Sequence, residues 1–183
     1  MKIPGALILG TALFLIGSAT SGQDTGASCA NHSGGAGSDH HAGVNARGDK
    51  VMGFDHEKTT HHFLLAAAGG SIEVTANRAE DKESRDAIRG HLAHIATMFS
   101  DGNFDAPMLV HDRTPPGVPV MKRKRADILW KYEEIENGAR VVAATKDPEA
   151  LSAIHEFLRF QIADHSTGDP GKVPAKTREQ PPG

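Results

Sequence analysis

Hydrophobic and polar positions follow the same order in two separate stretches of the chain, residues 59–100 and 126–165. Each stretch begins with two short segments of alternating apolar and polar residues on either side of a turn. A longer segment with apolar residues at helical spacing follows. The pattern therefore predicts the element order β-β-α-β-β-α.

In the first stretch, residues 59–67 and 71–75 are predicted strands that flank an Ala-Gly-Gly turn. A helix is predicted from about Ser84 to Ser100, capped by Ser84 or by an acidic residue near it. Its predicted buried face repeats every three or four residues, at Ile88, Leu92, Ile95 and Phe99.

In the second stretch, residues 126–133 and 140–145 are predicted strands around a Glu-Asn-Gly turn. Asp147 is the expected N-cap of a second helix, because Pro148 suits a first helical position. This helix is predicted to end near His165. Its predicted buried face comprises Leu151, Ile154, Leu158 and Ile162.

Between the two stretches, residues 108–111 suggest a short strand, and the proline-rich residues 114–119 suggest a rigid, non-helical connection. The predicted fold class is α+β, in which two ββα repeats form one antiparallel sheet with both helices packed on one face. Exchange of elements between two chains, giving a homodimer, is the alternative arrangement.

The ends of the chain differ from this predicted domain at residues 51–168. Residues 1–22 combine an early lysine, an apolar run and small residues, as in a cleaved signal peptide, which implies a periplasmic or secreted protein. Residues 23–50 are rich in Gly, Ala, Ser and His and are expected to form a disordered linker. Residues 169–183 are expected to be a disordered tail.

Charge and cysteine content narrow the class of function. The chain has 20 Lys and Arg against 23 Asp and Glu, a formal net charge of −3, which argues against nucleic acid as a partner. A single cysteine rules out an intrachain disulfide and a cysteine-based zinc site.

Histidine is the residue type that most suggests chemistry, since six of the 11 histidines fall within residues 56–112. On a strand, His61 should point with Phe63 toward the helices and His62 away from them. On the first helix, His91 and His94 lie beside the apolar face, where two imidazoles three residues apart can chelate one ion. The predicted metal ligands are His61, His62, His91, His94 and His111, with His56 and Met98 as weaker candidates.

Copper is the expected ion, because exported sets of His and Met suit a soft or borderline metal, and zinc is the next choice. A carrier or buffer would follow from such a site. The alternative is a metal-free periplasmic interaction module, whose proline-rich loop and basic residues 122–125 would meet a protein partner. An enzyme is the third hypothesis. It ranks last because no nucleophile or phosphate-binding motif is present.

Four motifs, MGF, TTHHF, PPGVPVMKR and EFLRFQIADHSTGD, begin at residues 52, 59, 115 and 156. Together they resemble an uncharacterised family of small exported bacterial proteins. The resemblance implies export and no particular activity. Such proteins are sometimes labelled aspartate carbamoyltransferase, but the Ser-Thr-Arg-Thr-Arg loop of that enzyme class is absent here.

Overall fold

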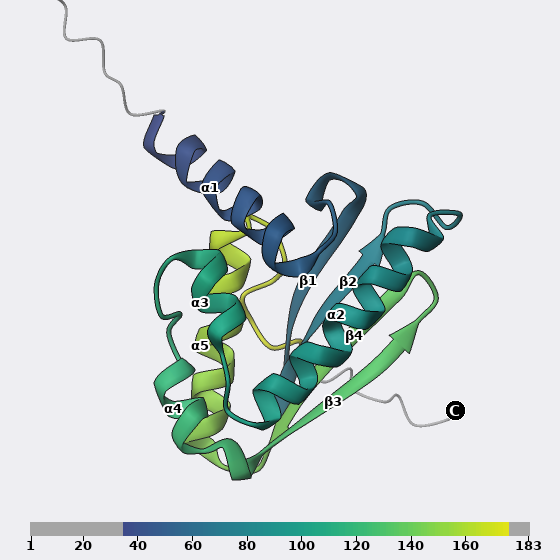
Figure 1. Cartoon of the computed structure of the whole chain (residues 1–183). Helices are drawn as coiled ribbons and strands as arrows, with labels where there is room; N and C mark the ends of the chain where they lie inside the picture. The colour runs from purple at the N-terminus through teal and green to yellow at the C-terminus, as the bar shows by residue number, and fades with distance from the viewer. Residues whose placement is uncertain (1–34, 176–183) are drawn as a thin grey trace, which may run out of the picture. The chain divides into compact units, whose positions relative to one another are not determined.

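The structure is a computed structural model that describes residues 35–175 (Figure 1). The predicted signal peptide, residues 23–34 of the predicted linker and residues 176–183 of the predicted tail lie outside the described residues. The elements in chain order are α1 (Gly35–Met52), η1 (His56–Lys58), β1 (Thr59–Ala66), β2 (Gly69–Ala76), α2 (Lys82–Ser100), α3 (Asp105–His111), α4 (Val118–Arg123), η2 (Arg125–Asp127), β3 (Ile128–Ile135), β4 (Gly138–Thr145) and α5 (Pro148–Asp164).

The four strands form one antiparallel sheet in the order β1-β2-β4-β3. The two predicted hairpins join along β2 and β4, where Ile72 pairs with Val141. Phe63 pairs in turn with Ile72, and Tyr132 with Val141, so their side chains lie on the same face of the sheet. The predicted α+β class is thus confirmed.

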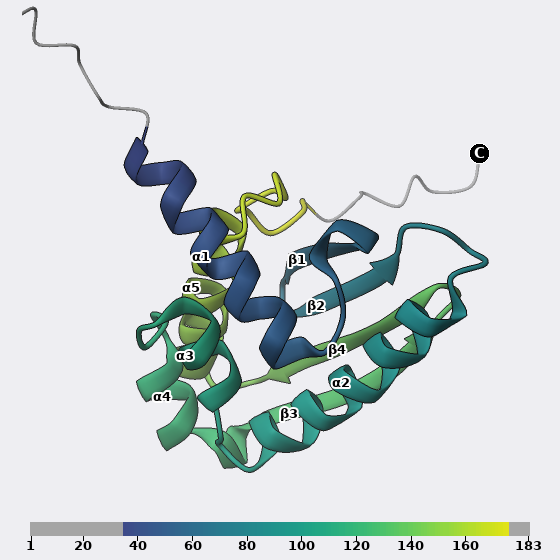
Figure 2. The ribbon, with the colours of Figure 1, turned by 45° about the horizontal axis from the view of Figure 1, so that its top comes forward.

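The helices of the two repeats, α2 and α5, each cover the hairpin of the other repeat. Helix α2 packs mainly on β3 and β4, whereas α5 packs mainly on β1 and β2 (Figures 1 and 2). The two helices meet where Phe99 of α2 lies 4.9 Å from Trp130 and 6.1 Å from Phe157, measured between ring centroids. Neither repeat therefore buries its apolar face alone, and the shared core joins them.

The N-caps of α2 and α5 agree with those predicted from the sequence. Asp81 accepts a hydrogen bond from the Ser84 backbone N–H at 3.0 Å, so the cap of α2 is the acidic residue near Ser84 that was the second predicted choice, and the helix begins at Lys82. Asp147 accepts one from the Ala150 N–H at 2.9 Å, which confirms it as the N-cap of α5. Both carboxylates also face the positive end of a helix dipole.

Two short elements differ from prediction. The expected strand at 108–111 is helical, because Pro107, Val110 and His111 are buried at helical spacing. Just before the helix, Asn103 Oδ1 accepts a hydrogen bond from the Asp105 N–H at 2.9 Å. Short apolar runs do not distinguish the two structures by periodicity. The connection expected to be non-helical turns into α4 at Val118, since a proline near the start of a helix loses no intrahelical bond.

The predicted linker is the largest difference, because residues 35–50 form most of α1 instead of a disordered segment. Contacts with the rest of the fold explain the order. Val44 is fully buried, His40 Nε2 lies 2.9 Å from Asp164 Oδ1, and Arg47 Nε donates to the Val110 carbonyl at 2.8 Å. Tertiary packing stabilises a helix that local composition does not favour.

The start of the predicted tail is also held in place. Asp169 accepts hydrogen bonds from the Phe63 backbone N–H at 2.9 Å and lies 2.8 Å from His62 Nδ1, at the outer edge of β1. Among residues 35–175, no helix is long and apolar enough to cross a bilayer.

Candidate metal site and histidine-lined cavity

One group of metal-binding side chains is already assembled in the part of the chain that the structure describes. Ligand atoms of Asp49, Asp55 and His56 all lie within 4.8 Å of one another. Residues 35–175 contain no such group made from the five predicted histidine ligands. The weaker candidate, His56, is therefore the predicted residue that belongs to an assembled set.

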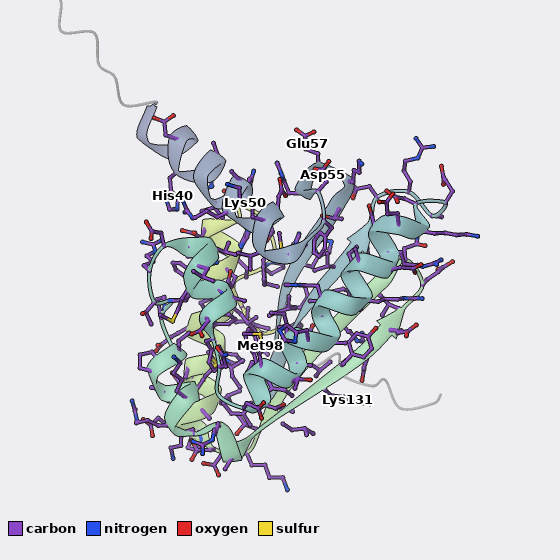
Figure 3. The ribbon with its side chains drawn as sticks, viewed as in Figure 1. His40, Lys50, Asp55, Glu57, Met98 and Lys131 are labelled. Atoms are coloured by element: carbon purple, nitrogen blue, oxygen red, sulfur yellow. The ribbon has the colours of Figure 1, made fainter. Side chains whose placement is uncertain are left out.

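A tight reversal of the chain brings these three residues together. Asp49 lies in the last turn of α1, and Gly53, at φ 77°, turns the chain so that η1 returns beneath that helix. The buried Phe54 ring anchors the loop in the core. Asp55 then caps η1 by accepting from the Glu57 N–H at 2.8 Å, and His56 begins η1. Asp55 and Glu57 lie at the edge of the molecule (Figure 3).

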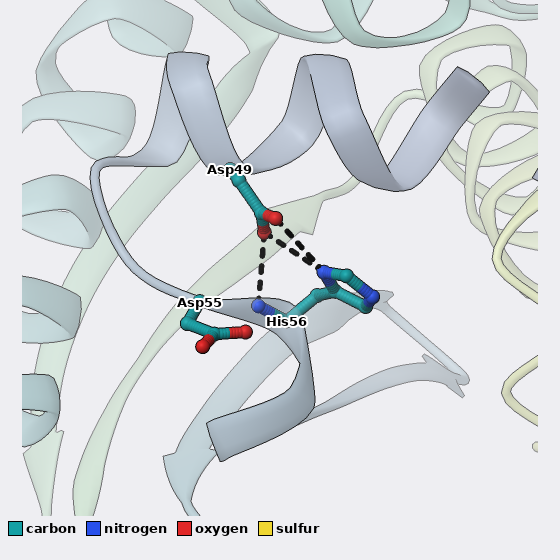
Figure 4. Close-up of side chains that lie close together, drawn as sticks. All are labelled: Asp49, Asp55 and His56. Carbon is teal, nitrogen blue, oxygen red and sulfur yellow. Dashed lines mark hydrogen bonds and ion pairs between the residues drawn. The ribbon is translucent and has the colours of Figure 1, made fainter. Parts of the chain in front are cut away.

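Asp49 and His56 make direct contact (Figure 4). Asp49 Oδ1 accepts from the His56 backbone N–H at 2.9 Å, and its Oδ2 lies 2.9 Å from His56 Nδ1. Both side chains are 35% exposed, so the group is open to solvent. Two carboxylates at the negative end of the α1 dipole concentrate negative charge there, which favours a cation.

A second feature is a cavity of about 70 Å³ between the inner face of the sheet and helices α1, α2, α3 and α5. Most of its wall is apolar, including Leu92, Ile95 and Phe157. Four histidines complete the wall: His61, His91, His111 and His165. We call this space the inner cavity.

An outer compartment of about 240 Å³ adjoins the inner cavity, and His61 and His165 line both spaces. Polar groups of Asn45, Thr59 and Thr167 contribute to its wall, as does His56 of the assembled metal-binding group. The rings of His61 and His165 lie nearly parallel, 7° apart, with centroids separated by 5.9 Å.

Burial keeps three of these histidines uncharged at neutral pH. Burial, and after it the neighbouring His91, lowers the pKa of His61 to about 4. Burial and the adjacent His94 lower the pKa of His91 to about 4, and burial, with His111 and His61, lowers that of His165 to about 3. Neutral imidazoles can donate or accept a hydrogen bond or bind a metal.

The structure thus places the predicted metal ligands in different parts of the fold. As predicted, His61 points toward the helices, where it shares the inner cavity with His91 and His111. His62 lies apart from them, beside Asp169, and His94 is exposed on α2. Both ring nitrogens of His111 are already engaged, Nδ1 with Asp164 at 2.5 Å and Nε2 with Gln161 at 2.7 Å. Met98 is half-buried and packs against the core.

Asp164 is a structural residue that the sequence did not single out. It is buried, and its carboxylate contacts His40 at 2.9 Å, His111 at 2.5 Å and Arg113 at 2.6 Å. Burial raises the pKa of Asp164, but the hydrogen bonds from His40 and His111 together outweigh burial and lower it to about 2. The Asp164 carboxylate, at the end of α5, therefore connects α5 to both α1 and α3.

The basic residues 122–125 are partly neutralised within the chain. Lys124 Nζ lies 2.8 Å from Asp147, and Arg123 lies 3.1 Å from Glu149. These pairs connect α4 to the first turn of α5, which gives the basic residues a structural role. An acidic protein partner at this position remains a prediction.

None of the known protein-family models, curated proteins or solved structures matches this chain. The chemistry of the Asp49–Asp55–His56 group and of the inner cavity is what bears on function.

Proposed function

We propose that this protein is an exported carrier or buffer for a divalent transition metal, held by Asp49, Asp55 and His56. The observation that carries the proposal is the assembly of two carboxylates and one imidazole with all ligand atoms within 4.8 Å. Asp49 and His56 are each 35% exposed, so an ion could enter and leave without unfolding of the domain. Exchange of this kind is what a carrier or buffer requires.

Zinc is the ion we favour. The sequence favoured copper because of its histidine and methionine content, but the assembled group consists of two carboxylates and one imidazole. Carboxylate and imidazole donors suit Zn²⁺ and Cu²⁺, whereas Cu⁺ prefers sulfur. Three protein ligands leave a fourth position for water or a second molecule, unlike the closed sites that serve only to stabilise a fold.

Export is supported by the pattern of residues 1–22, with a lysine, an apolar run and small residues in order. The test is expression in a Gram-negative host, followed by mass spectrometry of the periplasmic fraction. Recovery of a chain that begins near Gln23 is expected. Recovery of the uncleaved chain in the cytoplasm would contradict export while leaving the metal site untouched.

Metal binding is tested by titrating the chelator-treated protein with Zn²⁺ and, separately, with Cu²⁺ in a calorimeter. The test variant is Asp49→Asn/His56→Gln, which removes one carboxylate ligand and one imidazole ligand with little change in side-chain shape. The matched control is His62→Gln, because His62 forms another partly exposed His–Asp pair, with Asp169 at 2.8 Å. His91→Ala/His94→Ala tests the histidine set predicted from the sequence.

One equivalent of zinc is expected for the unchanged protein, the His62→Gln control and the His91→Ala/His94→Ala variant. Binding should be lost in Asp49→Asn/His56→Gln. If binding instead fails only in His91→Ala/His94→Ala, the ion belongs to the predicted histidine set and the proposed site is wrong. If neither metal binds, the metal-free interaction module becomes the better hypothesis.

A further inference from the structure

One histidine that lines the inner cavity has an unused hydrogen-bonding atom. His61 is largely buried, and no hydrogen-bond partner reaches its buried Nε2. Among residues 35–175, only one other buried side-chain nitrogen or oxygen shares this condition, Nε1 of Trp130. A buried polar atom without a partner is destabilising, so its retention calls for an explanation.

The surroundings of His61 define which molecule could supply the partner. A neutral imidazole has one donor and one acceptor nitrogen, and its tautomer can change. An amide or hydroxyl group can donate or accept, so either one can satisfy Nε2 in both tautomers. His61 lines both the inner cavity and the outer compartment, so a molecule bound beside it would lie next to both spaces.

The size and polarity of the two spaces restrict the rest of the ligand. The inner cavity is apolar and measures about 70 Å³. Since an apolar cavity of about 150 Å³ holds benzene, this one has room for a tail of about three carbon atoms. The outer compartment is larger and more polar, and is suited to hydrophilic parts of the molecule.

Charged molecules fit this site poorly. No carboxylate, lysine or arginine lines the inner cavity. The pKa values of His61 and His165, lowered to about 4 and about 3, keep both rings neutral at pH 7, so an anion would meet no counter-charge. Burial of an unpaired charge against apolar walls is strongly unfavourable.

We propose that the inner cavity binds a small uncharged amide or alcohol, with a short apolar tail among Leu92, Ile95 and Phe157 and its polar head hydrogen-bonded to His61 Nε2. The inference does not depend on the metal, since none of these residues belongs to the Asp49–Asp55–His56 group. The inference assigns a ligand to the inner cavity, separate from the metal-binding group.

The test compares three probes of similar shape: isobutyramide, isobutyrate and isobutylammonium. Each is titrated into the full chain at pH 7 with a chelator present, so that failure of the metal proposal cannot affect the result. The readout is the ¹⁵N chemical shift of His61 Nε2, which reports hydrogen bonding at that atom, alongside the methyl shifts of Leu92 and Ile95. His61→Phe keeps a ring and removes the nitrogen; His94→Phe, on the exposed face of α2, is the matched control.

Isobutyramide is expected to bind in the millimolar range and to shift both the His61 Nε2 and the methyl signals. The two charged probes should bind at least about ten-fold more weakly. His61→Phe should weaken isobutyramide binding and His94→Phe should leave it unchanged. If His61→Phe fails to fold, Val110→Phe, which fills the cavity from α3, should abolish the methyl shifts.

Three results would overturn the proposal. The first is the absence of shifts at saturating isobutyramide, which would mean that water alone occupies the cavity. The second is equal binding of the charged and uncharged probes. The third is isobutyramide binding that survives both His61→Phe and Val110→Phe.

Discussion

Acidification should destabilise this fold at a pH where most proteins remain stable, because three histidines are buried in the neutral form. The pKa values of His61 and His91 are lowered to about 4 and that of His165 to about 3, from an ordinary value of 6.5. In the unfolded chain these groups take up protons below pH 6.5, whereas in the folded chain they do not. Their contribution to stability is therefore complete above about pH 6.5 and is lost progressively as the pH falls toward 4.

The size of the effect follows from linkage. Each such histidine lowers the free energy of unfolding by about 1.4 kcal/mol per pH unit within this window, so each contributes a loss of about 2 kcal/mol at pH 5. For all three the loss is about 6 kcal/mol, against a total stability of about 5–15 kcal/mol for a typical domain. Asp164 opposes the shift at His165, and Asp49 opposes the shift at His61, so this figure is an upper value.

Urea unfolding at a series of pH values measures the effect directly. Trp130 is the only tryptophan and is 9% exposed, so its fluorescence reports loss of the core. His91→Leu should reduce the slope of free energy against pH by about 1.4 kcal/mol per unit. Thr97→Leu, at an exposed position on the same helix that carries no titratable group, is the control and should leave the slope unchanged. A free energy of unfolding that stays constant between neutral pH and pH 5 would refute the reasoning.

Three other changes test individual contacts, each by urea unfolding. Asp164→Asn should cost about 3 kcal/mol, because it removes the buried, charged acceptor that contacts the buried His111 ring; an unchanged midpoint would contradict this role. Asp147→Ala should cost about 1 kcal/mol through loss of the α5 cap, and a cost near zero would mean that the cap is dispensable. Gly117→Ala should cost about 3 kcal/mol, since an added Cβ would lie 2.1 Å from the Ala153 carbonyl oxygen. Gly168→Ala, also at positive φ but with no neighbour within 4 Å, should cost only about 1 kcal/mol; equal costs at the two glycines would show that backbone strain, not contact, decides.

Elements with a strong periodic pattern could be predicted from the sequence. The apolar repeat from Ile88 to Phe99 gave α2, and the Asn137-Gly138 turn gave the second hairpin, because local pattern and tertiary packing agree there. Helix α1 could not be predicted, since its order depends on partners more than 60 residues away, such as Val110 and Asp164. Composition describes a segment by itself and contains no information about such partners.

The candidate site shows the same division. Strand alternation correctly separated an inward His61 from a more exposed His62. The assembled metal-binding group was missed because Asp49 belongs to the segment expected to be disordered, and only the turn at Gly53 brings it against His56. The available signal was that His56 has acidic residues close to it in sequence, Asp49 before Gly53 and Asp55 after it. This signal is weak.

Helix α1 connects the two proposed sites. It supplies Asp49 to the metal-binding group, and its residues Val44 and Met52 line the outer compartment that leads to His61. The same helix is held to the rest of the fold by the buried Val44, by the contact of His40 with Asp164 and by the hydrogen bond from Arg47. Displacement of α1 would therefore remove one metal ligand and open the cavity together. A ligand in the outer compartment that contacts α1 would in turn favour the docked helix, so binding at one site should strengthen binding at the other.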